Sequence, residues 1–475
     1  MPRPVRLPEP EQRAVYRILN FALRAGAVML ASGAGTVEVE ATILAITDAC
    51  GLQAVEVDVT FTSLTASFIR GDDVEPVTTL QVVRHRSVDY GRLAAASRMA
   101  DDLVHGRIAP DQAMARLGEI QATPPRQGWR VLLGWAGMAA AFTVLLGGGP
   151  LVAVTGFVST TAVYLANRNL ARRGVPDFFL SAVGAAVATG LALVLVTTGA
   201  PATSSLVVAG GIMVLVPGYA LVASVQDALT GFPISAGARG LEVVMTAAGI
   251  VTGVAVVLYA ASAAGVTMAV VAPTFGTLGD VPAQVVAAGI AAALYGAATN
   301  VPRGFLAAAG LTGALGWGAF LGLEHGGAST IAATAVAALV VGFTGQILAA
   351  RLQTHPFLFI VPGVMPLVPG LTIYQGMLAL VYGQPGGSPT LLRALAAGLA
   401  IAAGVILGNV LLGPMMRVRH AHPGAPGIAP PPEDPVTPPP VDGSGPPRAE
   451  SGEGNEHEAP ESGPESSATV HPGPS

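Results

Sequence analysis

Residues 205–225 read SLVVAGGIMVLVPGYALVASV, an apolar stretch without a charged residue that is interrupted by Pro217 and Gly218. About 20 such residues cross the ~30 Å hydrocarbon core of a bilayer as a helix. Proline inside a spanning helix removes one backbone hydrogen bond and blocks another, so the freed carbonyls need a partner or a wet cavity. The stretch therefore predicts a broken membrane helix.

Similar apolar segments recur along the chain from residue 131. The expected spans lie at about residues 131–148, 150–166, 178–198, 205–225, 241–262, 283–299, 304–323, 328–349, 357–380 and 391–412. Residues 131–416 hold only seven Arg and five acidic residues, far fewer than a water-facing surface of that length needs. The chain is predicted to be an α-helical polytopic membrane protein with about ten transmembrane helices.

The two halves of this region echo each other. The LVPGY motif at 215–219 in the fourth expected span returns as LVPGL at 367–371 in the ninth, and the GxxxG pair at 249–253 in the fifth returns at 404–408 in the tenth. Five helices per half is an odd number, so the second half enters the membrane from the opposite side. These matches predict a 5+5 inverted repeat, the architecture of many secondary transporters.

Loop charges predict the orientation, because short cytoplasmic loops carry most of the Arg. With the N-terminus inside, the inner loops and the end of the last helix hold Arg168, Arg172, Arg173, Arg239, Arg303, Arg351, Arg417 and Arg419, and Arg393 is the single misfit. The first thirty residues resemble an amphipathic helix and lack the pattern of a signal peptide. We expect a multi-pass protein of the bacterial cytoplasmic membrane with both termini in the cytoplasm.

The sequence divides into four expected parts. Helical and alternating patterns over residues 1–125 predict a small cytoplasmic α+β domain. The membrane halves follow at 126–262 and 263–416, with five helices each. Residues 417–475 are rich in Pro, Gly, Ser and acidic residues and are expected to be disordered.

The broken fourth and ninth spans are the expected transport site, with half-helix N-termini holding a substrate carboxylate and polar groups holding its ammonium or hydroxyl. The candidate substrate-binding residues are Pro217, Gly218, Tyr219, Gln226, Pro362, Gly363, Pro369, Gly370, Thr372, Tyr374 and Gln375. Asp227 and Glu242 are the candidates for the coupling proton. Two simpler interpretations stay open: the Pro-Gly pairs only kink helices for packing, and the carboxylates lie in the headgroup layer.

Other chemistries find little support. The chain has no GxxxxGK[ST], HExxH or GxSxG motif, its His residues are scattered and Cys50 is its only cysteine, so we expect neither an enzyme nor a metal or cofactor site. The chain lacks a basic stripe interleaved with aromatic residues, so we do not expect it to bind nucleic acid. In the first domain Glu38, Glu40, Asp58 and Thr60 could serve a sensor or enzyme, but without a partner cluster we expect solvated surface.

Three segments of the first domain carry a resemblance to a known family. They run from Ala22 to Glu40, through the SGAG turn at 32–35, from Val57 to Thr60, and from Val83 to Asp89. Together with the two LVPG motifs they resemble the threonine/serine exporter family over roughly residues 11–415. The chain departs from the family pattern at Ala96-Ser97, where an Asn is expected, so no role of that Asn transfers.

The resemblance implies a secondary exporter of small amino acids, threonine and serine, driven by the proton motive force. Its expected partners are the amino-acid substrate, protons and the lipid bilayer, and a homo-oligomer stays open. Two alternatives also stay open: a dicarboxylate exporter of the succinate type, which should have Arg deep in the membrane, and a membrane-anchored sensor or enzyme that uses the first domain.

Overall fold

The computed structural model describes residues 9–70, 74–84, 86–123, 128–198, 204–266, 281–381 and 384–420. The predicted disordered tail lies outside these residues apart from its first four, which continue the last helix.

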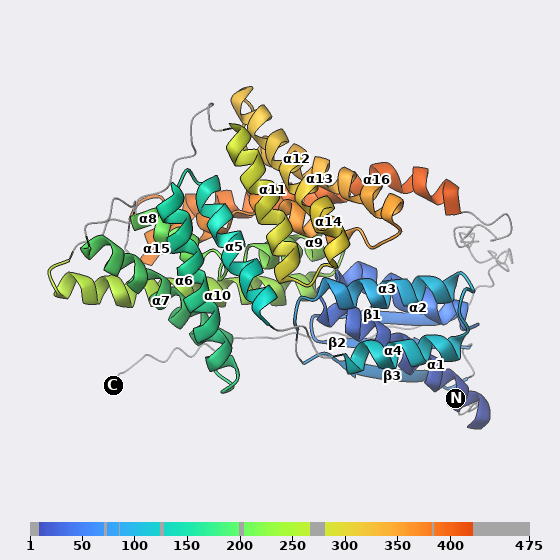
Figure 1. Ribbon diagram of the computed structural model, residues 1–475. Coiled ribbons are helices and arrows are strands. Elements are labelled where there is room, and N and C mark those ends of the chain that lie inside the picture. Colours follow the sequence, from blue (N-terminus) through green and yellow to red (C-terminus); the bar gives the residue numbers. More distant parts are fainter. Residues whose placement is uncertain are drawn as a thin grey trace, which may run out of the picture. The chain divides into compact units, whose positions relative to one another are not determined.

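The described residues up to 123 form three strands and four helices, drawn in blue to teal in Figure 1. In chain order they are α1 (Glu9–Ala31), α2 (Thr36–Ala49), β1 (Val55–Val59), β2 (Ser63–Phe68), β3 (Val77–Val82), α3 (Tyr90–Val104) and α4 (Pro110–Ala122). The sheet is antiparallel in the order β1-β2-β3, with Ala66 opposite Val57 on one side and Thr79 on the other. Helix α1 packs on β2, β3, α2 and α3, and buries Leu19 and Leu23 completely or nearly so.

The rest of the described chain is helical. Its elements are α5 (Trp129–Leu145), α6 (Pro150–Ala171), α7 (Asp177–Thr197), α8 (Ser204–Ile212), α9 (Gly218–Leu229), α10 (Pro233–Ala263), α11 (Val281–Ala298), η2 (Arg303–Phe305), α12 (Leu306–His325), α13 (Thr330–Leu352), α14 (Phe357–Val364), η3 (Met365–Leu367), α15 (Gly370–Val381) and α16 (Gly387–His420).

Eight helices among the described residues are long and apolar enough to cross a membrane, or nine if the bent pair formed by residues 357–367 and 370–377 is one span. One of the eight is α1, whose apolar face the sheet covers. Helix α5 is apolar but shorter, with 17 residues. The chain is therefore a polytopic α-helical membrane protein.

Both LVPG motifs interrupt their helices. Helix α8 ends at Ile212 and α9 begins at Gly218, while α14 continues into η3 and α15 begins at Gly370 after a bend of 44°. At each break proline precedes the first residue of the new helix, as expected where a missing N–H is harmless.

The two motifs lie against each other. A Cβ atom built on Gly218 would lie 1.9 Å from Cγ1 of Val368, and one built on Gly370 would lie 2.6 Å from Cγ1 of Val216. Each glycine thus meets the valine of the other motif, and neither position has room for a side chain. Sequence positions that correspond in the two halves meet reciprocally at this crossing.

Helix packing repeats along the chain in matching pairs. The second half repeats the first when α5, α6, α7, α8, α9 and α10 are matched in order with α11, α12, α13, α14, α15 and α16. Seven helix contacts of the first half then have a counterpart: α5–α6, α6–α7, α6–α8, α7–α8, α5–α8, α7–α10 and α9–α10. The GxxxG glycines take part: a Cβ on Gly253 would lie 2.0 Å from the Ala182 carbonyl oxygen of α7, and one on Gly404 2.3 Å from that of Ala335 in α13. Small residues here let the helix backbones approach closely.

Candidate functional site

A cavity of about 720 Å³, called the vestibule below, opens between the start of α2 and the helices α9, α13, α14 and α16. Its lining residues are Gly35, Thr36, Val37, Glu38, Ala41, Gln226, Asp227, Thr230, Gln346, His355, Pro356, Phe357, Ile406, Asn409 and Val410. Polar side chains therefore line it from both sequence halves and from the first 123 residues. Gln346 donates to Asn409 at 3.0 Å, which joins α13 to α16 at its wall.

A smaller recess of about 30 Å³ adjoins the vestibule, since Gly35, Gln226, Asp227 and Phe357 line both. Its other walls are mainly apolar, from α9, α14 and α16, with Tyr219 and Arg239 as further polar groups. A space of that size holds about one water molecule. In this conformation the recess is therefore too small for an amino acid.

A buried ion pair lies at the recess. Nε of Arg239 donates to Oδ2 of Asp227 at 2.7 Å, and the two side chains are only 9% and 4% exposed. The hairpin between α9 and α10 sets this geometry: Gly231 turns the chain with φ of +91°, and Ser224 Oγ donates to the carbonyl of Ala236 at 2.7 Å. Removing two charges from water is costly, so the pair depends on its mutual contact.

A second guanidinium approaches this pair from the segment before α3. Arg86 lies over the ring of Phe61 at 3.9 Å, and Arg239 lies over the same ring at 5.6 Å. Nε and Nη2 of Arg86 are buried without a hydrogen-bond partner among the described residues. Burial, followed by the repulsion from Arg239, lowers the pKa of Arg86 to about 10. The cluster therefore holds a second cation, two of whose nitrogens have no hydrogen-bond partner in the described part of the chain.

Two contacts fix the first 123 residues against the membrane helices at the vestibule. Nε2 of His355, just before α14, forms an ion-pair contact with the Glu38 carboxylate, and both side chains are mostly buried. The Tyr219 hydroxyl donates to the carbonyl of Gly33 at 3.2 Å. The turn before α2 therefore lies directly against the broken helix α9.

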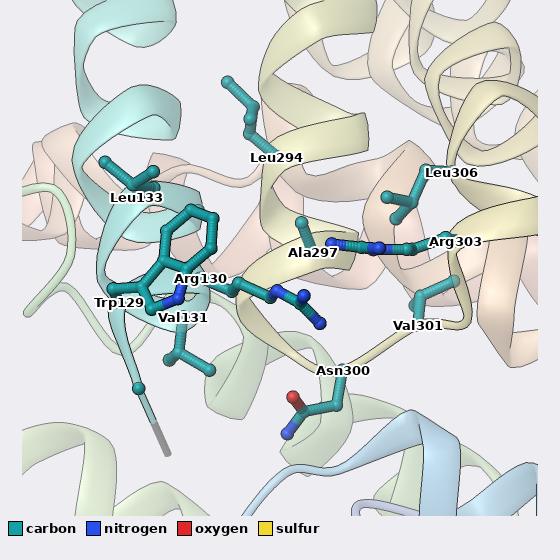
Figure 2. A pocket seen from close by; sticks show the side chains of 12 residues that line it. Trp129, Arg130, Val131, Leu133, Leu294, Ala297, Asn300, Val301, Arg303 and Leu306 are labelled. Atoms are coloured by element: carbon teal, nitrogen blue, oxygen red, sulfur yellow. The ribbon is translucent and has the colours of Figure 1, made fainter. Parts of the chain in front are cut away.

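A further cavity, of about 600 Å³, lies between the start of α5, the end of α11 and η2 (Figure 2). Arg130 and Arg303 point into it, and leucines from three helices form its walls.

The family model described as "Putative threonine/serine exporter" (ThrE) matches residues 20–261, and a second model, "Threonine/Serine exporter, ThrE", matches residues 284–411. The chain belongs to the threonine/serine exporter family. A "Probable threonine/serine exporter" of Mycobacterium tuberculosis is 34% identical over 84% of this chain and 77% of its own length. The "Threonine/serine exporter" of Corynebacterium glutamicum is 32% identical over 83% of this chain and 82% of its own. No solved structure matches the chain.

In this exporter family member, the predicted site residues fall into groups. Tyr219, Gln226 and Asp227 line the recess or the vestibule. Gly218 and Gly370, each preceded by its proline, form the crossing. Glu242, one turn beyond Arg239 on α10, is exposed and contributes a favourable charge to Arg86.

The remaining predicted residues lie on α14 and α15. Pro362 and Gly363 are buried in α14, where Thr312 Oγ1 donates to the Phe359 carbonyl at 2.9 Å. Thr372, Tyr374 and Gln375 lie on α15, and none is among the residues that line the vestibule or the recess. The structure thus brings the candidates of α9 together with the start of α14 and keeps those of α15 beyond the crossing.

Three participants were not predicted. Arg239 was assigned to an inner loop, yet it is buried and paired. Arg86 lay within a family segment without a role. Glu38 was expected to be solvated, which is wrong, because His355 covers its carboxylate. For Arg239, the small and apolar residues that precede it in the sequence were a signal that its charge could be buried.

Proposed function

We propose that this chain exports threonine and serine across the bacterial cytoplasmic membrane, driven by the proton motive force. The observation that carries the proposal is the buried pair of Asp227 and Arg239, which lines a cavity beside the crossing of two broken helices. The printed names of both relatives support the substrate class. Ionisable groups buried at such a place are typical of substrate and proton pathways.

The proposed architecture has ten spans in a 5+5 inverted repeat, with halves at residues 126–262 and 263–416 and a cytoplasmic α+β domain at 1–125. The matching helix pairs support the repeat, because the seven helix contacts of the first half given above each have a counterpart in the second. The reciprocal contact of Gly218 and Gly370 with the opposite valines supports a two-fold relation about the crossing. In this arrangement the vestibule faces the cytoplasm.

The buried charges suggest how a zwitterion is held. We assign the substrate ammonium to Asp227 and its carboxylate to the guanidinium groups of Arg86 and Arg239, with Gln226 and Tyr219 beside them. Arg86 has unpaired donors, and a planar carboxylate accepts from a guanidinium in a bidentate manner. The protein's own ion pair would then open as the substrate binds between its partners.

Transport requires the recess to widen past the crossing. Pro217 and Pro369 supply the breaks at which half-helices can move, with Pro362 and Gly363 inside the half-helix before the second break. Thr372, Tyr374 and Gln375 would receive the substrate on the far side. Asp227 and Glu242 are the proposed carriers of the coupling proton. Both lie on the α9–α10 hairpin, so protonation and substrate binding act on one element.

The test is efflux of preloaded labelled threonine, serine and succinate from cells with and without the protein, each with and without a protonophore. Threonine and serine efflux that the protonophore abolishes would support the proposal. Efflux of succinate alone, or efflux insensitive to the protonophore, would contradict the substrate or the driving force. In the same assay the D227N variant should lose efflux. Its matched control is D177N, which changes an exposed acid at the start of α7 and should keep it.

A further inference from the structure

The cavity of Figure 2 is unlike the vestibule, because both charged side chains that line it are cationic. Its twelve lining residues include Arg130 and Arg303 and no acidic residue. The two side chains extend toward one another, Arg130 from α5 and Arg303 from η2 (Figure 2). Two cations on opposite sides of one groove form a receptor for an anion.

No other residue that the structure describes neutralises either guanidinium. Within the described part of the chain, the side chains of Arg130 and Arg303 form no ion pair and no hydrogen bond, and the Arg130 guanidinium lies 5.5 Å from the centre of the Trp129 ring. The Asp89 carboxylate, which contacts the lining residue Asn300, already accepts hydrogen bonds from the Asn300 side chain at 3.1 Å and from the backbone N–H of Arg92 at 3.0 Å. The positive charge of the groove is therefore available to a ligand.

The walls of the groove are apolar. Leu133, Leu294 and Leu306 come from α5, α11 and α12, and the lining also contains Val131, Ala297 and Val301. Helices α11 and α12 are apolar enough to span a membrane, so these walls continue into apolar helix faces. A free inorganic anion would use the guanidinium groups alone and leave these walls uncovered.

Exposed apolar groups mark the same place as a membrane boundary. Trp129, the first residue of α5, is 65% exposed, and Leu133, one turn later in the same helix, is 43% exposed. Tryptophan is enriched at the level of the lipid headgroups, and arginine at helix ends keeps its charge at that level. The cationic end of the groove consequently lies where lipid phosphates are found.

We propose that this groove binds one anionic phospholipid, with its phosphate between Arg130 and Arg303 and an acyl chain along Leu133, Leu294 and Leu306. Guanidinium pairs bind phosphate oxygens through charge-assisted, bidentate hydrogen bonds. Basic pockets between membrane helices are known to hold anionic headgroups. The site is separate from the vestibule and does not depend on what the protein transports.

The lipid would lie beside the contact between α3 and the membrane helices. Asn300, at the rim of the groove, has a left-handed backbone with φ of 63° and donates to Asp89, while the Tyr90 N–H donates to the Thr299 carbonyl at 2.9 Å. Arg303 follows three residues later. A headgroup at Arg303 thus touches the turn that anchors the start of α3.

The first test is native mass spectrometry of the purified full chain, titrated with phosphatidylglycerol and phosphatidylcholine of equal chain length. The wild type should hold phosphatidylglycerol about tenfold or more tightly, and R130Q/R303Q should lose that preference. The control R172Q/R351Q removes the same charge at exposed helix ends elsewhere and should keep it. Equal binding of both lipids by the wild type, or an unchanged preference in R130Q/R303Q, would overturn the proposal.

A competitor without acyl chains separates lipid from free phosphate. Glycerol 1-phosphate should displace phosphatidylglycerol only at concentrations about a hundredfold higher or more, because it cannot bury apolar surface against the leucines. Displacement at equal concentrations would show a phosphate site only, which would overturn the assignment to a lipid.

A second measurement needs no variant and so is independent of folding defects. Phosphatidylglycerol with a photoreactive group in its acyl chain should label peptides containing residues 129–134 and 294–306 of the wild type. Uniform labelling of all membrane helices would contradict a defined site.

Discussion

The carboxylate of Asp227 and the guanidinium of Arg239 form a 2.7 Å ion pair within the α9–α10 hairpin, and both side chains are almost completely buried. A pair of this kind contributes little to stability compared with apolar residues of the same volume, whereas removing one partner leaves an uncompensated charge. Because the pair adds little stability, we infer that its use lies in transport.

Variants of this pair should separate stability from function. D227N should lower the free energy of unfolding by about 3–5 kcal/mol, because Arg239 loses its partner. D227L/R239M should recover most of that stability, yet threonine efflux should stay abolished. Thermal unfolding of the purified proteins and efflux from cells with equal protein levels measure the two effects. Active D227L/R239M would remove the pair from the proposed mechanism.

Arg86 should show the opposite separation. Its pKa is lowered to about 10, so the folded state disfavours its charged form; this loss of stability is complete below about pH 10 and fades as the pH rises toward the higher, ordinary pKa of arginine. R86Q should therefore unfold at the same temperature as the wild type or higher at pH 7, while its KM for threonine rises about tenfold or more. R86K, which keeps the charge, should be intermediate. A normal KM in R86Q would show that the guanidinium does not meet the substrate.

The crossing should tolerate no added methyl group. G218A places a Cβ 1.9 Å from Val368, and overpacking of this kind costs about 1–3 kcal/mol. V368A should relieve the clash, so G218A/V368A should regain protein level and part of the efflux. G190A is the control, because a Cβ on Gly190 would meet nothing within 4 Å. No difference between G218A and G190A would mean that the two motifs are not in contact.

The contact between Glu38 and His355 should couple the first domain to the membrane helices. E38Q and H355Q should each reduce efflux, and their effects should be less than additive, because either change alone breaks the same contact. The measurement is a double-mutant cycle on the efflux rate, with E56Q on the exposed edge of β1 as the control. Strictly additive effects would indicate that the two residues act separately.

Local sequence patterns predicted the elements well and the site only in part. Alternating patterns within residues 1–125 predicted strands, three of which the structure contains, and the LVPG and GxxxG motifs identified positions at which helix backbones approach closely. Charge partners could not be predicted in this way. Glu38 and His355 are far apart in sequence, and Arg86 and Arg239 meet over Phe61 only because folding brings three separate segments together.

The reciprocal fit of Gly218 with Val368 and of Gly370 with Val216 also bears on how such chains diverge. Neither glycine can gain a side chain unless the valine facing it shrinks, so an accepted change in one motif needs a second change in the other. Mutations at these four positions should therefore become fixed in pairs, and a relative whose first motif lacks glycine should have a residue smaller than valine at the facing position of its second.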